Sequence, residues 1–322
     1  MLALFTNLIL ALLALVAVLL ALLPYLLALV VLLALFARAI FPKPALVTIP
    51  YSHYVELARW ALDASRIRYS EIKYPVGPHS MLVPLIRCLF HPLWPGSGPA
   101  PPTATDTSFP GHDVEQTWWS FAGVKWARRL AGVPCFIDEQ RRLHPDSWAV
   151  LRLGGFTVDE PTREVLDDEV GPDVRRIMYH HLFRSSPELY RRVQSCGAVE
   201  MALFDLSEAI GATRPTIQQW LGTDETAVRA AEERLRARFQ ATSDILTTDP
   251  YLGAGAGDDD FGGADLAWAA LTALLFLPPK YGNGQVDMAT ADELPADYRA
   301  FQAELLETRA GKHTLACYER HR

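Results

Sequence analysis

The sequence lacks charged side chains from Met1 to Ala37, and Leu, Ala and Val make up most of that stretch. About 20 apolar residues in a helix cross the hydrocarbon core of a bilayer, so the run predicts a membrane-spanning segment. It also lacks a basic start and is much longer than the apolar part of a signal peptide, which argues against a cleaved leader. We therefore expect a transmembrane anchor over residues 1–42.

The length of the apolar run argues against one straight span. As a single helix it would extend about 55 Å, more than tilting usually absorbs. Pro24 lies near its middle, where proline removes a helical hydrogen bond and kinks or breaks the helix. One kinked helix and a hairpin of two short helices about Pro24 both remain open. Arg38 and Lys43 are the first charges after the run, so the positive-inside bias predicts a membrane protein whose soluble body faces the cytosol.

The rest of the chain lacks a basic excess and a cysteine motif. Its 30 Lys and Arg against 37 Asp and Glu give a net charge of −7, which argues against a nucleic-acid partner. The cysteines are scattered without a CxxC pair or metal-type spacing, which argues against a disulfide framework and against a metal site. They are Cys88, Cys135, Cys196 and Cys317.

Residues 43–153 alternate between strand-like and helix-like segments, interrupted by a proline-rich insertion at about 76–129. The strand–helix–strand order at the start predicts a parallel strand pair with a right-handed crossover. Expected strands are Ala45–Ile49, Arg68–Tyr74, Val133–Asp138 and Gln140–Leu143; expected helices are Tyr54–Ala64, Met81–Phe90, Trp118–Leu130 and Asp146–Leu153. Within the insertion, Pro92–Asp113 is expected to be a low-complexity loop.

After a linker over residues 154–171, the segment 172–322 has an almost wholly helical pattern. The expected helices are Asp173–Phe183, Pro187–Ile210, Thr213–Leu221, Asp224–Leu246, Ala264–Phe276 and a last one through Ala300–Glu307. The run Asp258–Asp260 lacks the alternating ligand spacing of a calcium loop, so we interpret it as a turn. The body is therefore predicted to be α+β, a small mixed domain followed by an all-helical one.

Several motifs in this order resemble one known family. The stretch S-H-Y-V-E-L-A-R-W-A-L-D at Ser52–Asp63 is similar to the first-helix motif of a bacterial-type subgroup of glutathione transferases, usually S-H-Y-C-E-K-A-R-W-A-L-D. Further matching motifs are Val133-Pro134, Asp146–Leu151, Tyr251–Gly253, Phe261–Leu266, Leu277–Gly282 and Cys317–Arg322. The resemblance covers about residues 46–322 apart from the insertion. It implies a thioredoxin-like domain before an all-helical substrate domain, glutathione as co-substrate, a cis proline at Pro134 and a homodimer.

The resemblance and the chemistry of glutathione together suggest where the tripeptide binds. The residue before a cis proline leaves its backbone groups free at a strand edge, so Val133, before Pro134, can pair with the tripeptide. Asp146 and Ser147 open a helix whose N-terminus favours the γ-glutamyl carboxylate, and Asp146 can take the ammonium. A plain helix cap remains the alternative for Asp146 and Ser147.

Ser52 is the candidate catalytic residue, with Tyr51 and Tyr54 as alternatives. Ser52 and Val55 stand where a redox C-x-x-C would have its cysteines, so disulfide exchange is not expected. A hydroxyl at a helix N-terminus can instead stabilise a bound thiolate. The leading hypothesis is a membrane-anchored detoxification enzyme that conjugates glutathione to apolar electrophiles partitioning into the bilayer. The alternatives are a non-catalytic binding or interaction protein of transferase fold at a membrane, and a glutathione-dependent reductase or peroxidase that uses Cys135.

Overall fold

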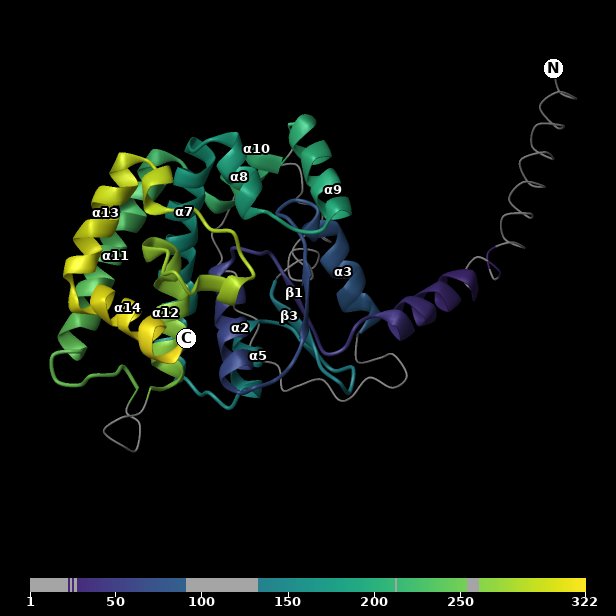
Figure 1. Ribbon diagram of the computed structural model, residues 1–322, viewed down its shortest axis with the longest axis horizontal. Coiled ribbons are helices and arrows are strands. Elements are labelled where there is room, and N and C mark those ends of the chain that lie inside the picture. The colour runs from purple at the N-terminus through teal and green to yellow at the C-terminus, as the bar shows by residue number, and fades with distance from the viewer. Residues whose placement is uncertain (1–22, 24, 26–27, 91–132, 212, 254–260) are drawn as a thin grey trace, which may run out of the picture.

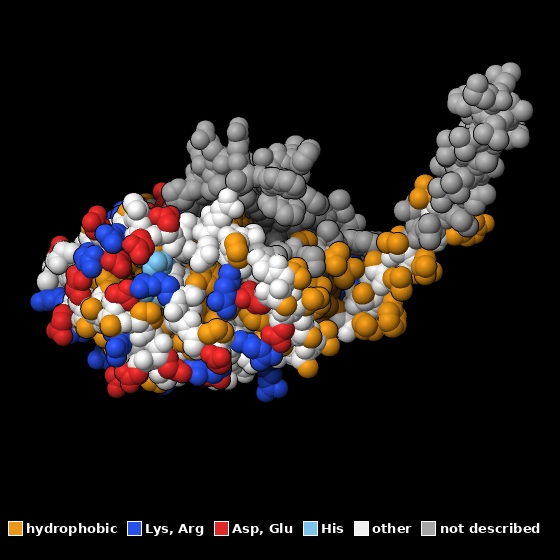
Figure 2. Space-filling view, turned by 90° about the horizontal axis from the view of Figure 1, so that it is seen from above, with side chains coloured by type: hydrophobic (Ala, Val, Ile, Leu, Met, Phe, Trp, Pro, Cys, Tyr) orange, Lys and Arg blue, Asp and Glu red, His pale blue; other side chains and the backbone are white. Residues whose placement is uncertain are grey.

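The computed structural model describes residues 23, 25, 28–90, 133–211, 213–253 and 261–322. Residues 28–40 form a helix that projects from the body, with exposed apolar side chains gathered on it (Figures 1 and 2). No helix within the described residues is long and apolar enough to cross a bilayer. Residues 1–22, Pro24, the helix expected at Trp118–Leu130, the loop Pro92–Asp113 and the turn Asp258–Asp260 lie outside the described residues.

A four-stranded mixed sheet lies at the centre of the first domain. Its strands are β1 (Ala45–Thr48), β2 (Ser70–Lys73), β3 (Cys135–Ile137) and β4 (Leu143–His144), in the order β2-β1-β3-β4. β1 pairs with β2 in parallel, and β3 is antiparallel to both β1 and β4. The predicted parallel pair is thus confirmed within a small mixed sheet, and β4 is shorter and later than expected.

Strand side chains alternate between two faces, and each face is covered by helices (Figure 1). Leu46 and Phe136, which are paired in register, pack with residues of α2 (His53–Ala64) and α5 (Ser147–Leu153). Val47 and Cys135, the next pair, pack on the opposite face with residues of α3 (His79–Leu89). The alternation explains why β1 is buried at every position.

The remaining elements form the helical domain, as expected. Their bounds are α6 Glu160–Glu164, a π-helical segment Val165–Val170, α7 Gly171–Arg184, α8 Pro187–Val193, α9 Ala198–Ala209, α10 Thr213–Leu221, α11 Glu225–Ile245, α12 Gly263–Phe276, short 3₁₀ turns at Tyr281–Gly284 and Ala291–Glu293, α13 Ala296–Glu307 and α14 Arg309–His321. Every residue of α12 is buried. α12 therefore forms the centre of the domain, and it packs against α2 of the sheet domain as well as α7 and α14 (Figure 1).

Three segments differ from the expectation. The single helix expected at Pro187–Ile210 is split at residues 194–197, because the side chain of Gln194 turns into the core and accepts a hydrogen bond from the backbone of Val76 at 2.9 Å. The linker expected at 154–171 is helical from Glu160, because the Asp159 side chain caps that turn by accepting from Thr162 N–H at 3.0 Å. α14 was not predicted; Thr308 begins it by accepting a hydrogen bond from Gly311 N–H at 3.0 Å.

Candidate functional site

The N-termini of α2 and α5 open at the same end of the sheet domain. Their C-terminal ends are tied together by the Ser65 hydroxyl, whose oxygen lies 2.8 Å from Ala61 O and 2.5 Å from Gly154 O. Closer to the N-termini of the two helices, Ala58 of α2 and Val150 of α5 pack in one apolar cluster. α2 has twelve residues and α5 seven, so at about 1.5 Å per residue the first turn of α5 begins about 7 Å short of the first turn of α2. Asp167 lies beside both N-termini, because the Tyr54 hydroxyl donates to its backbone oxygen at 3.2 Å and the charge of Asp146 acts on its carboxyl. Ser52 and Asp146, the residues that precede the two helices, therefore lie toward the same end of the domain.

Val133 reaches the same end. The Val133-Pro134 peptide bond is cis, as the resemblance implied. Val47 of β1 pairs with Cys135 of β3 in an antiparallel register, and extending that register places Val133 opposite Ile49. Ile49 O accepts a hydrogen bond from Ser52 N–H at 3.1 Å, so the backbone before the cis proline lies beside the turn that leads into α2.

Ser52 is the N-cap of α2 but does not cap it with its side chain. Its carbonyl oxygen accepts from Glu56 N–H at 2.9 Å, whereas its hydroxyl makes no capping hydrogen bond. Within the described part of the chain, the half-buried Ser52 hydroxyl has no hydrogen-bond partner. A donor is therefore left unused at the positive end of a twelve-residue helix.

Asp146 does act as a helix cap. Its Oδ1 accepts a hydrogen bond from Ala149 N–H at 2.7 Å, which accounts for one oxygen of the carboxylate. Ser147, the first residue of α5, is buried. The capping interpretation of Asp146 is thus confirmed, and its binding of an ammonium through the second oxygen stays a prediction.

The two tyrosines considered as alternatives to Ser52 are engaged elsewhere. The Tyr51 ring is buried in the core of the helical domain, where its hydroxyl accepts from Gln194 Nε2 at 3.1 Å. The Tyr54 hydroxyl donates to the backbone oxygen of Asp167 at 3.2 Å. Burial raises the pKa of both phenols well above the ordinary value, and nearby Tyr179 acts on Tyr51 in the same sense. Neither phenol is placed to stabilise a thiolate.

Cys135 is fully buried on the sheet face that α3 covers. Burial raises the pKa of its thiol, against the opposing charge of Arg87. A protonated thiol inside an apolar cluster is a poor nucleophile. The geometry therefore gives the peroxidase or reductase hypothesis no accessible cysteine at this position.

α7 brings a set of groups to the N-terminus of α2 that sequence patterns did not reveal. His53 Nε2 lies 3.0 Å from Gly171 O, and the guanidinium carbon of Arg175 lies 6.0 Å from the centre of the Tyr54 ring. Burial first, and then the charge of Arg175, lower the pKa of His53 to about 3, although the contact with Gly171 opposes the change. Arg175 carried no signal in the sequence, because only the packing of α7 against α2 places it there.

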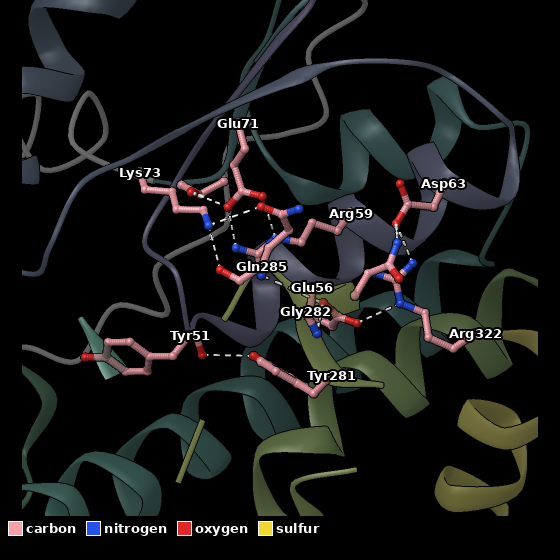
Figure 3. Close-up of polar contacts among 12 residues, drawn as sticks. Tyr51, Glu56, Arg59, Asp63, Glu71, Lys73, Tyr281, Gly282, Gln285 and Arg322 are labelled. Carbon is pink, nitrogen blue, oxygen red and sulfur yellow. Dashed lines mark hydrogen bonds and ion pairs between the residues drawn. The ribbon is translucent and has the colours of Figure 1, made fainter. Parts of the chain in front are cut away.

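The charged residues of the Ser52–Asp63 motif point away from this end and build an ion network instead (Figure 3). Arg59 Nε and Nη2 donate to the two carboxylate oxygens of Glu71 at 3.1 and 2.5 Å. Arg322 Nε donates to Glu56 Oε1 at 3.0 Å, and its Nη1 donates to Asp63 Oδ2 at 2.6 Å. The motif therefore joins α2 to the last residue of the sequence.

Two other motifs end in the same network. Gly282 N–H donates to Glu56 Oε2 at 2.9 Å and the Tyr318 hydroxyl donates to Glu56 Oε1 at 3.2 Å. The Tyr281 hydroxyl donates to Tyr51 O at 2.8 Å, as Figure 3 shows. Burial raises the pKa of the fully buried Glu56, while Arg322 and Arg59 oppose the rise. The motifs that carry the resemblance are thus largely the contacts that fasten the helical domain to α2.

A cysteine, a histidine and an aspartate also meet between α12 and α14, but not as a catalytic triad. His313 Nε2 lies 2.9 Å from Asp265 Oδ1 and 3.4 Å from Cys317 Sγ. A triad needs one ring nitrogen for the carboxylate and the other for the nucleophile. Both contacts here fall on one nitrogen, and burial raises the pKa of Cys317, so the group is structural. Among the described residues, no three or more His, Cys, Asp or Glu side chains are arranged so that they could hold a metal ion.

Comparison with known proteins gives similarity in structure only. No family model matches the sequence, and no curated protein matches it. A glutathione transferase from Phanerochaete chrysosporium is 15% identical with a TM-score of 0.46, over 88% of this chain and 98% of that one. Glutathione transferase F7 from Populus trichocarpa is 12% identical with a TM-score of 0.39, over 84% and 97%. A glutathione S-transferase from Methylobacillus flagellatus, with glutathione bound, is 10% identical with a TM-score of 0.35, over 84% and 98%.

Proposed function

We propose that this protein is a glutathione transferase that works at a membrane, where it conjugates the glutathione thiolate to apolar electrophiles. The observation that carries the proposal is the Ser52 hydroxyl, which has no partner among the described residues and lies at the N-terminus of α2 beside the backbone that precedes cis Pro134. A peptide thiol bound along that backbone would bring its sulfur to the unpaired Ser52 hydroxyl at this end of the domain.

Three parts of glutathione, its cysteinyl backbone, its γ-glutamyl end and its thiol, would each meet a counterpart at this end of the domain. The backbone of Val133 pairs with the tripeptide, and the second carboxylate oxygen of Asp146, together with Ser147, holds the γ-glutamyl end. The Ser52 hydroxyl and the N-terminal backbone of α2 stabilise the thiolate, which lowers the thiol pKa and raises the reactive fraction at neutral pH. The sulfur then attacks an electrophilic carbon: a C–S bond forms, the bond to the leaving group breaks, and the thiol proton has already passed to solvent.

The test of this function uses the full chain in detergent or in vesicles. Retention on immobilised glutathione is measured first, then conjugation of a chloronitroarene by wild type, Ser52→Ala and Ser195→Ala. Ser195 is an exposed serine whose side chain has no hydrogen bond within the described residues, so it serves as the matched control. We expect Ser52→Ala to lower kcat about 100-fold, as loss of one preorganised donor does, with little change in glutathione binding.

The other outcomes are equally informative. A folded protein that does not bind glutathione contradicts the proposal. Binding without turnover favours the non-catalytic binding protein of transferase fold. Turnover that survives Ser52→Ala removes Ser52 from its role. Loss of turnover in Cys135→Ala at unchanged stability would revive the peroxidase or reductase hypothesis.

Membrane attachment through residues 1–42, with the body facing the cytosol, is part of the same proposal. It is supported by the uncharged run Met1–Ala37 and by the positions of Arg38 and Lys43. Flotation with vesicles is expected for the full chain and not for a chain that begins at Pro44. Equal flotation of both would place the membrane contact in the body instead. A homodimer also stays a prediction, which sedimentation of the detergent-solubilised protein tests.

A further inference from the structure

Arg175 is a cation at the candidate site that has no acidic partner among the residues that the structure describes. Its Nε is buried and has no hydrogen-bond partner, and Arg175 forms no ion pair with any acidic side chain in the described ranges. Its neighbour on α7, Arg176, is different: it donates to Asp173 Oδ1 at 2.6 Å and to Leu221 O at 3.0 Å. Partly buried guanidinium groups are normally paired with carboxylates or other acceptors. The Nε–H of Arg175 is thus a buried donor without a partner among the described residues.

The position of Arg175 relates it directly to the reacting end of the proposed site. Its guanidinium lies over the ring of Tyr54, two residues after Ser52. One turn before Arg175, the backbone oxygen of Gly171 contacts His53, the residue after Ser52. The buried carboxyl of Asp167 is also near Tyr54, but its Oδ1 has no hydrogen-bond partner among the described residues and the cation that acts on it is Arg163. Asp167 and Arg175 therefore form no ion pair in the described part of the chain.

The next turn of α7 carries aromatic rings into the core. Tyr179 follows Arg175 by one helical turn, and its ring lies 5.5 Å from the Tyr51 ring and 5.6 Å from the Phe183 ring. Tyr51 and Tyr179 are buried, so these rings hold α7 against the start of α2. The half-buried Arg175 is the charged group at the edge of this packing.

We propose that Arg175 binds an anionic group, a carboxylate in the simplest case, on the electrophile. The co-substrate is then amphiphilic, with an apolar body that carries the reactive carbon and one acid group. A guanidinium presents two parallel N–H donors to a carboxylate, and such charge-assisted pairs are about twice as strong as neutral hydrogen bonds. This inference rests on the proposed function, since it names the substrate class for the same site.

The test compares two electrophiles with the same reactive carbon, 4-chloro-3-nitrobenzoate and its neutral amide. Full-length wild type, Arg175→Gln, Arg175→Lys and the control Arg229→Gln are assayed with saturating glutathione. Arg229 is exposed on α11 and pairs only with Glu225 one turn away. For Arg175→Gln we expect kcat/KM for the benzoate to fall about 10- to 100-fold, mainly through KM, from loss of a charge-assisted contact. The amide should change less than about twofold, and Arg175→Lys should keep part of the preference for the acid.

Because each value compares one electrophile between two enzymes, the intrinsic reactivities of the benzoate and the amide cancel. Equal losses on acid and amide would overturn the inference. A rise in KM for glutathione with both electrophiles would also overturn it, since the anion held by Arg175 would then be a carboxylate of glutathione. If neither electrophile is conjugated, the proposed function fails first, and calorimetric binding of the benzoate still decides on Arg175. Weaker binding in Arg175→Gln than in Arg229→Gln supports an anion site there, and equal binding refutes it.

Discussion

Replacing Arg322 with methionine tests the ion network most directly. The change removes one of two guanidinium groups and keeps an apolar side chain against Trp60, whose ring centre lies 5.7 Å from the Arg322 guanidinium. Glu56 would keep its contacts with Gly282 N–H and the Tyr318 hydroxyl, and Arg59 would remain at 3.8 Å. The buried carboxylate thus loses its closest cation and nothing else.

The expected loss of stability follows from the burial of each partner. Removing one member of a buried ion pair costs about 3–5 kcal/mol, because the other charge stays buried and uncompensated. Glu56 is fully buried, but its remaining contacts compensate in part, and Asp63, whose side chain is 28% exposed, can be hydrated. We therefore expect a loss of about 2–4 kcal/mol in the free energy of unfolding, equivalent to a fall in Tm of roughly 3–7 °C at this chain size.

Because Glu56 is buried, the destabilisation caused by Arg322→Met should depend on pH. The network holds the carboxylates of Glu56, Asp63 and Glu71 against the guanidinium groups of Arg59 and Arg322, so one negative charge is in excess. A carboxyl whose folded pKa is raised favours the folded state at low pH and loses that contribution as pH rises through the folded pKa. Loss of Arg322 raises that pKa further. The destabilisation by Arg322→Met should therefore be largest near pH 8 and shrink toward pH 5.

Urea unfolding followed by circular dichroism at pH 5 and pH 8 measures both effects, with Arg322→Lys as the charge-conserving control. In the double variant Glu56→Gln/Arg322→Met, the loss should be smaller than the sum of the single losses by about 1 kcal/mol or more. A loss below about 0.5 kcal/mol, the range of exposed salt bridges, or a destabilisation that grows at low pH, would refute this account of the network.

Three further predictions concern single positions. His53 has a folded pKa of about 3, so it stabilises the fold above its unfolded pKa and loses that contribution as pH falls. In urea unfolding, we expect His53→Gln to flatten the wild-type decline of about 2 kcal/mol in the free energy of unfolding between pH 7.5 and 4.5. An equal decline in both proteins would contradict this. A Cβ on Gly263 would overlap the backbone oxygen of Thr157, so Gly263→Ala should lower the free energy of unfolding by about 2–3 kcal/mol in thermal melts. The exposed Gly155 is the control, because a Cβ there meets no atom and only its φ of +83° disfavours a side chain. Gly155→Ala should lower the free energy of unfolding by about 1 kcal/mol. Burial raises the pKa of the Cys196 thiol to about 12 and also raises the pKa of the Cys135 thiol. Aromatic disulfide reagents react with the thiolate, so at pH 8 they should label both cysteines slowly until urea is added. Fast labelling of the native protein would contradict the burial.

The sequence alone determined the features that depend on neighbouring residues. The order of strand, helix and strand from Ala45 to Lys73 follows from β-prone runs and from helical periodicity, both of which act within a few residues. Asp146 and Asp224 mark helix starts for the same local reason. The positions of these elements could therefore be predicted without knowledge of the rest of the chain.

Only the tertiary structure decided where side chains go when their partners are distant. Glu56 and Arg322 are 266 positions apart, so nothing near the motif indicates that it fastens the helical domain instead of contacting a ligand. Gln194 breaks a helix that its own sequence favours, because its side chain bridges Val76 and Tyr51 in the core. Arg175 lies at the N-terminus of α2 only because α7 packs there. In each case the free energy of a long-range contact outweighs local preference, and that contact exists only in the folded chain.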